Sequence, residues 1–258
     1  MSFNPENGSF EHSNWDKSAV IKLLASILPD NCILHRQSQL GPYECDGLSA
    51  YKKVPKLVLL PETIDQCQQI VRFCNARDIP LIARGAGTGL AGGVLPIEQA
   101  IIMSLAKFNQ IKKIDPELRI AILEPGVRNL AISEAVDQFG LFYAPDPSSQ
   151  IACTIGGNVA ENSGGVHSLK YGLTVNNVLG IKIIDCDGEI IEIGGGVLRS
   201  VSVVFVAIMI NLRLGWQVPS CGWRPRSRCS ESVGDGAGRA IGPVSFSYSP
   251  TYAVVRWE

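Results

Sequence analysis

Near the N-terminus, apolar side chains recur three and four positions apart over residues 17–28, directly after Asp16. This spacing predicts an amphipathic helix, which the segment 13–16 (SNWD) could cap and Pro29 would end. Farther along, short apolar runs at 56–60 and 79–83 predict two buried strands. The segment between them begins with the capping-box spacing of a helix N-terminus at Thr63. The pattern therefore predicts helix, strand, helix, strand.

The same alternation continues to about residue 194. A helix is predicted over 129–139, where Gly140 ends it, and strands are predicted over 100–104, 120–124, 141–143 and 178–184. We therefore expect an α+β fold with a helical N-terminal segment, 1–42, and one domain, 43–194. Its subdomains lie at about 43–111 and 112–194, and each is expected to supply one wall of a shared site.

The pattern ends at Gly194. Residues 1–194 contain ten lysines and six arginines, whereas residues 195–258 contain seven arginines and no lysine. Three of the four tryptophans and nine serines also lie in this tail. Two interpretations stay open: an Arg-rich, loosely structured extension, or an out-of-frame translation after a frameshift. Either leaves the domain incomplete at its C-terminal end.

Composition excludes several classes of protein. The formal net charge is −1, and no basic stripe is interleaved with aromatic residues, so we expect no nucleic-acid partner. The polar N-terminus lacks a secretory signal, which favours the cytoplasm. The longest apolar run, 201–210, is too short for a membrane helix, which needs roughly 20 residues. Eight cysteines form no CxxC pair, so we expect reduced thiols and no metal site.

A glycine-rich loop follows the strand at 79–83. Five glycines lie among the ten residues 84–93, so backbone N–H groups can approach and surround a phosphate. The loop also fits the G-x-G-x-x-G pattern of nicotinamide-binding Rossmann folds. That alternative is weak, because Pro96 and a strand follow instead of a helix. Phosphate binding is favoured over a plain turn.

A second glycine-rich window lies at 146–165. Its four glycines and small polar side chains, including Asn158 and Asn162, suit a backbone that lies against a flat ring and hydrogen-bonds its heteroatoms. A flavin fits that description better than a loop without a ligand does.

Five segments together resemble a known family. They are 43–51 (YECDGLSAY), 84–90 (RGAGTGL), 125–133 (PGVRNLAIS), 146–149 (DPSS) and 154–165 (TIGGNVAENSGG). In these segments the chain, over residues 43–194, resembles the glycolate oxidase D-subunit family of FAD-linked oxidases. That family has the two-subdomain FAD-binding fold of vanillyl-alcohol oxidase and p-cresol methylhydroxylase. The resemblance implies FAD as the cofactor, held between the subdomains.

By that resemblance, the residues that would hold the pyrophosphate are Arg84, Gly85, Ala86, Gly87, Thr88, Gly89, Leu90 and Gly93. Those that would line the flavin and its ribityl chain are Pro125, Gly126, Asp146, Pro147, Ser148, Ser149, Ile155, Gly156, Gly157, Asn158, Glu161, Asn162, Gly164 and Gly165. Tyr171 and Gly172 would close the same wall. The pyrophosphate loop contains no histidine, so we expect non-covalent binding. His167 is interpreted as a structural residue, and no catalytic residue is assigned.

The resemblance implies oxidation of a small 2-hydroxy acid such as glycolate or D-lactate. It also implies a second flavin-domain subunit and an iron–sulfur subunit, and through them peripheral attachment to the inner membrane. The family's substrate-binding cap is not recognisable in 195–258, so the chain alone is expected to be inactive. Two alternatives stay open: a non-catalytic product of a disrupted gene, and another FAD oxidoreductase of the same superfamily, such as a cell-wall precursor reductase.

Overall fold

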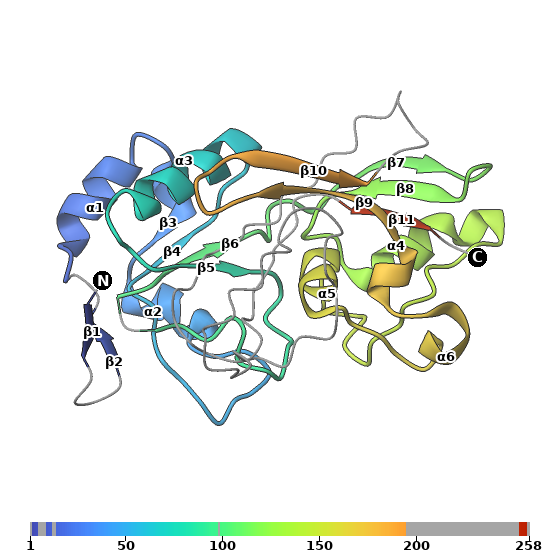
Figure 1. Cartoon of the computed structure of the whole chain (residues 1–258), viewed down its shortest axis with the longest axis horizontal. Coiled ribbons are helices and arrows are strands. Elements are labelled where there is room, and N and C mark those ends of the chain that lie inside the picture. The colour runs from blue at the N-terminus through green and yellow to red at the C-terminus, as the bar shows by residue number, and fades with distance from the viewer. Residues whose placement is uncertain (1, 5–8, 12–13, 98, 195–252, 257–258) are drawn as a thin grey trace, which may run out of the picture.

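The structure is a computed structural model that describes residues 2–4, 9–11, 14–97, 99–194 and 253–256. It contains two main sheets, each with helices packed against it (Figure 1). The strands of the first are ordered β3-β4-β6-β5, and those of the second β10-β9-β11-β8-β7. The N-terminal residues add a separate antiparallel pair, β1 (Ser2–Asn4) and β2 (Ser9–Glu11).

The first sheet is mostly parallel. Its strands are β3 (Ile33–Leu34), β4 (Leu57–Leu59), β5 (Leu81–Arg84) and β6 (Ile101–Ser104). Its helices are α1 (Lys17–Leu24), α2 (Gln37–Leu40) and α3 (Ile64–Asn75), with short 3-10 turns at Asp30–Cys32 and Gly41–Tyr43. β4 and β5 both run parallel to β6, and α3 makes the crossover from β4 to β5. Parallel strands need such a crossover connection. Strands of a parallel sheet are commonly buried on both faces, so they appear in the sequence as continuous apolar runs, which is how β4, β5 and β6 were predicted.

The predicted caps are confirmed in both long helices of this half. The Asp16 carboxylate accepts hydrogen bonds from the backbone N–H groups of Ser18 and Ala19, which lie in the first turn of α1. At α3, Thr63 Oγ1 accepts from Gln66 N while the Gln66 side chain accepts from Thr63 N. Each cap satisfies donors that the first helical turn leaves without partners.

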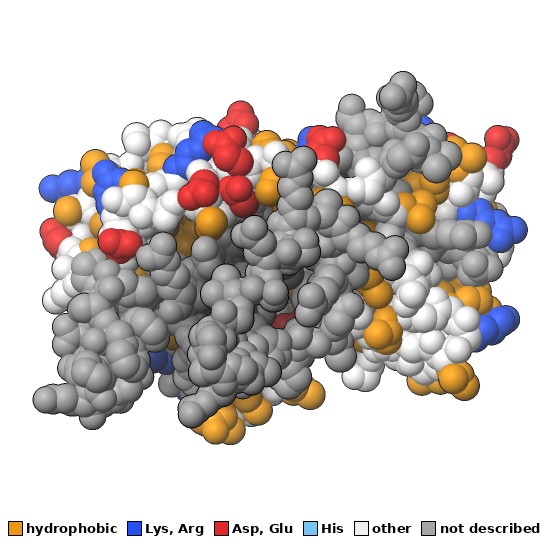
Figure 2. Space-filling view, in the orientation of Figure 1, with side chains coloured by type: hydrophobic (Ala, Val, Ile, Leu, Met, Phe, Trp, Pro, Cys, Tyr) orange, Lys and Arg blue, Asp and Glu red, His pale blue; other side chains and the backbone are white. Residues whose placement is uncertain are grey.

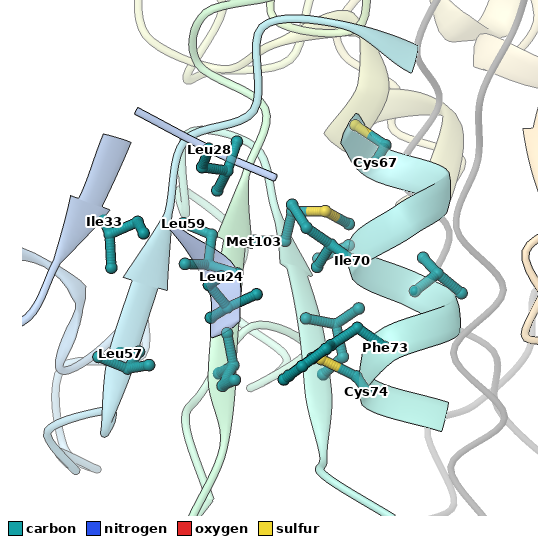
Figure 3. Close-up of a cluster of buried hydrophobic side chains, with 14 of the residues drawn as sticks. Leu24, Leu28, Ile33, Leu57, Leu59, Cys67, Ile70, Phe73, Cys74 and Met103 are labelled. Atoms are coloured by element: carbon teal, nitrogen blue, oxygen red, sulfur yellow. The ribbon is translucent and has the colours of Figure 1, made fainter. Parts of the chain in front are cut away.

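The first core lies between this sheet and the helices α1 and α3. Figure 3 shows Ile70, Phe73 and Cys74 of α3 directed at the sheet residues Leu59 and Met103. Leu59 and Met103 have no exposed surface. Burial raises the pKa of the Cys74 thiol to about 12, so this cysteine behaves as a small apolar side chain.

Leu59→Ala is expected to lower the free energy of unfolding by about 2–5 kcal/mol, because the removed methyl groups leave a cavity among atoms that relax only partly. Leu118→Ala is the matched control, since Leu118 is 54% exposed in the turn after β7; it should change stability by less than about 0.5 kcal/mol. Urea denaturation followed by circular dichroism measures both. Equal losses would contradict the placement of Leu59.

The second sheet is antiparallel. Its strands are β7 (Ile111–Asp115), β8 (Ile120–Leu123), β9 (Val178–Ile184), β10 (Ile190–Gly194) and β11 (Ala253–Arg256). Its helices are α4 (Asn129–Val136), α5 (Ile155–Glu161) and α6 (Ser168–Tyr171), with 3-10 turns at Asp137–Phe139 and Thr174–Asn177. The predicted end of the 129–139 helical stretch at Gly140 is confirmed, because Gly140 has the left-handed φ of 67°.

Some predicted elements differ from the structure. Residues 141–143 form no strand, because Tyr143 N donates to Ser133 Oγ instead of to a neighbouring strand. The strands β7 and β10 were not predicted from the sequence. In β10 the pattern is mostly exposed, so it lacks the apolar alternation of a half-buried strand.

The C-terminal tail was assigned to a separate region, and most of it, 195–252 and 257–258, lies outside the described residues. So does the apolar run at 201–210. The four residues of β11 pair antiparallel with both β8 and β9. No helix among the described residues is long and apolar enough to cross a membrane.

The β9–β10 hairpin joins the two halves. It reaches from the second sheet to α3, as Figure 1 shows. There Gln68 Nε2 donates to the Gly188 carbonyl at 2.8 Å, and Arg72 pairs with Glu189 at 3.0 Å. Ile184, at the end of β9, belongs to the first core. Figure 2 shows acidic side chains gathered over α3 and this hairpin. Exposed ion pairs contribute little, so burial of Ile184 carries most of this contact.

Candidate cofactor site

The glycine-rich loop begins where β5 ends. Arg84, the last residue of β5, is 6% exposed, and its Nη1 donates to the Cys45 carbonyl at 2.8 Å. Its guanidinium also lies over the Tyr43 ring, 5.5 Å from the centroid. Burial lowers the pKa of Arg84, but an arginine titrates so high that the side chain stays cationic. Arg84 therefore ties the loop to the 43–51 segment.

Two glycines are required by the geometry of this loop. Gly87 has φ +72°, and a Cβ there would collide with the Arg84 guanidinium. A Cβ on Gly47 would lie 2.8 Å from the carbonyl oxygens of Thr88 and Gly89. The 43–51 segment thus packs directly behind the loop. In contrast, Ala86 and Leu90 are exposed.

The second glycine-rich window contains a helix, which the sequence did not predict. α5 begins after its N-cap, Thr154, and ends at Asn162, whose φ of 49° is left-handed. A Cβ on Gly85 would lie 2.6 Å from Thr154 Oγ1, so the loop and the start of α5 touch. At Gly157 a Cβ would meet nothing nearer than 3.8 Å. The two predicted walls are therefore brought together.

Three buried polar atoms in this region have no hydrogen-bond partner. They are Asp46 Oδ2, Thr154 Oγ1 and Asn158 Nδ2, although the Asn158 amide lies beside the Cys153 thiol, a weak acceptor. In proteins the great majority of buried polar atoms have a hydrogen-bond partner, so each buried atom without one suggests a ligand that supplies the partner. A cofactor with several heteroatoms bound here fits this requirement.

Pro125 and Gly126 link the walls from behind. The Pro125 carbonyl accepts from Gly156 N at 2.8 Å, and Gly126 N donates to the Phe108 carbonyl at 2.7 Å. A Cβ on Gly126 would lie 2.6 Å from the carbonyl oxygens of Leu105 and Phe108. This glycine is needed where the chain passes between the first core and α5.

Asp146 lies against the end of the second glycine-rich window. A Cβ on Gly165 would collide with the Asp146 carbonyl, so these two backbones are in contact. Asp146 Oδ1 accepts from His167 N at 3.1 Å, and Oδ2 lies 2.7 Å from His167 Nδ1. The Tyr171 ring lies 6.3 Å from the His167 ring. Gly172, with φ 80°, ends α6.

Sequence reasoning missed part of this arrangement. His167 was interpreted as a structural residue; the pairing of its Nδ1 with Asp146, which orients the ring, was not predicted. Asp46 and Thr154 were not assigned to the site, although both stand in segments that carried the resemblance. The site was predicted mainly from clustered glycines, and neither Asp46 nor Thr154 is a glycine, so the sequence pattern did not single them out. Among the described residues, no cluster of three or more His, Cys, Asp or Glu side chains could hold a metal ion.

Known proteins match more than half of this chain. A family model described as an FAD-binding domain matches residues 55–194. The glycolate oxidase subunit GlcD of Escherichia coli (strain K12) is 52% identical over 185 residues, which are 72% of this chain and 37% of that protein. The D-lactate dehydrogenase of Archaeoglobus fulgidus is 37% identical over 146 residues, 57% of this chain and 32% of that protein. The chain thus spans about a third of the length of these relatives.

The fold is also found among solved structures. p-Cresol methylhydroxylase with substrate bound superposes with a TM-score of 0.64 at 20% identity, over 93% of this chain and 43% of that one. The predicted fold class is therefore confirmed, and the family model confirms FAD as the cofactor. The chain belongs to the FAD-binding domain family.

Proposed function

We propose that this chain is the FAD-binding portion of an oxidoreductase that acts on 2-hydroxy acids such as glycolate or D-lactate. Its relatives are named for these substrates. The observation that carries the proposal is the contact of two glycine-rich walls at Gly85 and Thr154, beside buried polar atoms that need partners.

Each wall would have its own role. The N–H groups of loop 84–93 would bind the pyrophosphate, while Arg84 holds the loop against the 43–51 segment. Pro125, Gly126 and the residues of 146–149 and 155–165 would line the flavin, and Tyr171 and Gly172 would close that wall. FAD, when bound, accepts the hydrogen that the substrate loses at its α-carbon. His167, whose Nδ1 is held by Asp146, would hold or move a proton at Nε2.

The name of the Escherichia coli relative identifies it as one subunit of a larger enzyme. We extend this to our chain and propose assembly with a second flavin-domain subunit and an iron–sulfur subunit. The assembly would lie in the cytoplasm, at the inner membrane.

Titration of the purified chain with FAD tests cofactor binding. We expect quenching of flavin fluorescence on binding and full release of the flavin on denaturation, since the loop offers no histidine for a covalent link. Protein that neither copurifies with flavin nor quenches added FAD would contradict the proposal.

A test of the substrate class requires the part of the enzyme that the relatives have beyond the matched region. We propose a chimera that joins residues 1–194 to the C-terminal part of the Escherichia coli relative, chosen for its 52% identity. Glycolate or D-lactate should reduce its bound flavin under anaerobic conditions, whereas the corresponding amino acids, glycine and D-alanine, should not. Reduction by neither 2-hydroxy acid, in a chimera that binds FAD, would contradict the substrate class.

A further inference from the structure

Glu161 places a carboxyl group against the glycine-rich loop. It is the last residue of α5, and its Oε1 lies 3.0 Å from the position of a Cβ on Gly93 and 3.7 Å from that of one on Gly89. The carboxyl makes no hydrogen bond to a described residue. Its side chain is exposed, and the partial cover that the surrounding protein gives the carboxyl raises the pKa of Glu161 by desolvation. The two distances thus place a carboxyl group beside the proposed phosphate position.

A second acid lies nearby. Asp46 is 6% exposed; its Oδ1 accepts from Leu48 N at 2.8 Å, while its Oδ2 has no partner. The charge of Asp46 further raises the pKa of Glu161. Among the described residues, Asp46 is the charged group that acts on Glu161, and Arg84 in turn interacts with Asp46. Glu161 therefore faces negative charge without a cation of its own.

A pyrophosphate in the loop would add more negative charge. It carries one negative charge per phosphate group, and a ligand bound against the loop would reduce the exposure of the Glu161 carboxyl to solvent. An ionised Glu161 would repel the ligand, whereas a protonated one offers a hydrogen-bond donor to a phosphate oxygen. A neutral carboxylic acid is thus the form of Glu161 that is compatible with the ligand.

We propose that Glu161 binds the FAD pyrophosphate as a neutral carboxylic acid, so that FAD binding takes up one proton. This role rests on the proposed function, because that function places the pyrophosphate in the loop; it assigns Glu161 to the pyrophosphate instead of to the flavin wall, since its Oε1 lies near Gly89 and Gly93. The proton comes from solvent and stays on the Glu161 carboxyl, where it is shared with a phosphate oxygen; no other bond forms or breaks.

The sign of the pH dependence follows from linkage. Because the bound state holds the proton more tightly than the free chain, FAD binds best at low pH. Affinity then falls as the pH rises above the pKa of Glu161 in the free chain, and levels off above its pKa in the complex. Within that window the Kd should rise by up to about tenfold per pH unit, the limit for one proton.

Calorimetric titration of the full chain with FAD, in two buffers of different ionisation enthalpy between about pH 5 and pH 8, measures the proton directly. We expect uptake that approaches one proton per FAD within the window. Glu161→Gln keeps a neutral donor, so it should still bind FAD but lose both the proton uptake and the pH dependence. Asp46→Asn removes the neighbouring charge and should move the window to lower pH.

The control is Glu117→Gln, an exposed glutamate in the turn between β7 and β8, which should behave as the parent chain does. FAD binding without proton uptake, or an unchanged pH profile in Glu161→Gln, would overturn this role and leave the proposed function standing. No FAD binding at any pH would overturn both. The measurement on the parent chain needs no variant, so the test holds even where a variant fails to fold.

Discussion

Gly87→Val is expected to weaken FAD binding between about fivefold and about 150-fold. A β-branched residue at the φ of +72° is strained by about 1–3 kcal/mol, and its Cβ would also collide with the Arg84 guanidinium. Without ligand, the loop relieves that strain by moving, since it lies at the surface. Binding requires the original conformation, so the cost appears in the Kd and not in the stability of the chain.

The matched control is Ala86→Ser, one position earlier on an exposed residue of the same loop. It adds a side-chain atom without a change in backbone preference and should leave the Kd nearly unchanged. Fluorescence titration with FAD gives both constants, and thermal denaturation of the ligand-free proteins should show little difference between them. Equal affinities for FAD in the two variants would remove the loop from the site.

The chain alone, loaded with FAD, is expected not to oxidise glycolate or D-lactate at a useful rate. Holding the reacting carbon in position can supply roughly 7–11 kcal/mol of a barrier. In the family that the sequence resembles, a cap domain supplies this positioning, together with a cation for the substrate carboxylate. Residues 195–258 do not resemble that cap.

Anaerobic mixing of the FAD-loaded chain with excess substrate measures this directly by the loss of flavin absorbance. The chimera described above serves as the positive control and should lose its absorbance rapidly. Equally rapid loss in the chain alone would mean that residues 1–194 hold the catalytic groups. His167, oriented by Asp146, would then be the first residue to replace.

Local features of the fold were readable from the sequence alone. The caps at Asp16 and Thr63 act within one helical turn, so their side chains reveal the helices that they begin. The parallel strands β4, β5 and β6 are buried on both faces and therefore appear as continuous apolar runs. The glycine-rich loop was equally clear, since so many glycines in ten residues exclude regular structure.

Other features depended on contacts between distant parts of the chain. β11 pairs with β8 across more than 120 residues, and local spacing does not reveal a partner so distant in the sequence. Glycines at 156 and 157 disfavour a helix, yet α5 forms there because Pro125 and Val127 accept its first N–H groups.

Short-range spacing in the sequence was enough for the α+β alternation and the two glycine-rich walls, and the resemblance of five segments to a known family added the FAD-binding fold and the cofactor. Only the tertiary structure decided which side chains meet at those walls. It paired Asp146 with His167 and brought Asp46 and Glu161 to the same loop, 115 positions apart in the chain. Such encounters are set by how two sheets pack against each other, and no local pattern of residues encodes them.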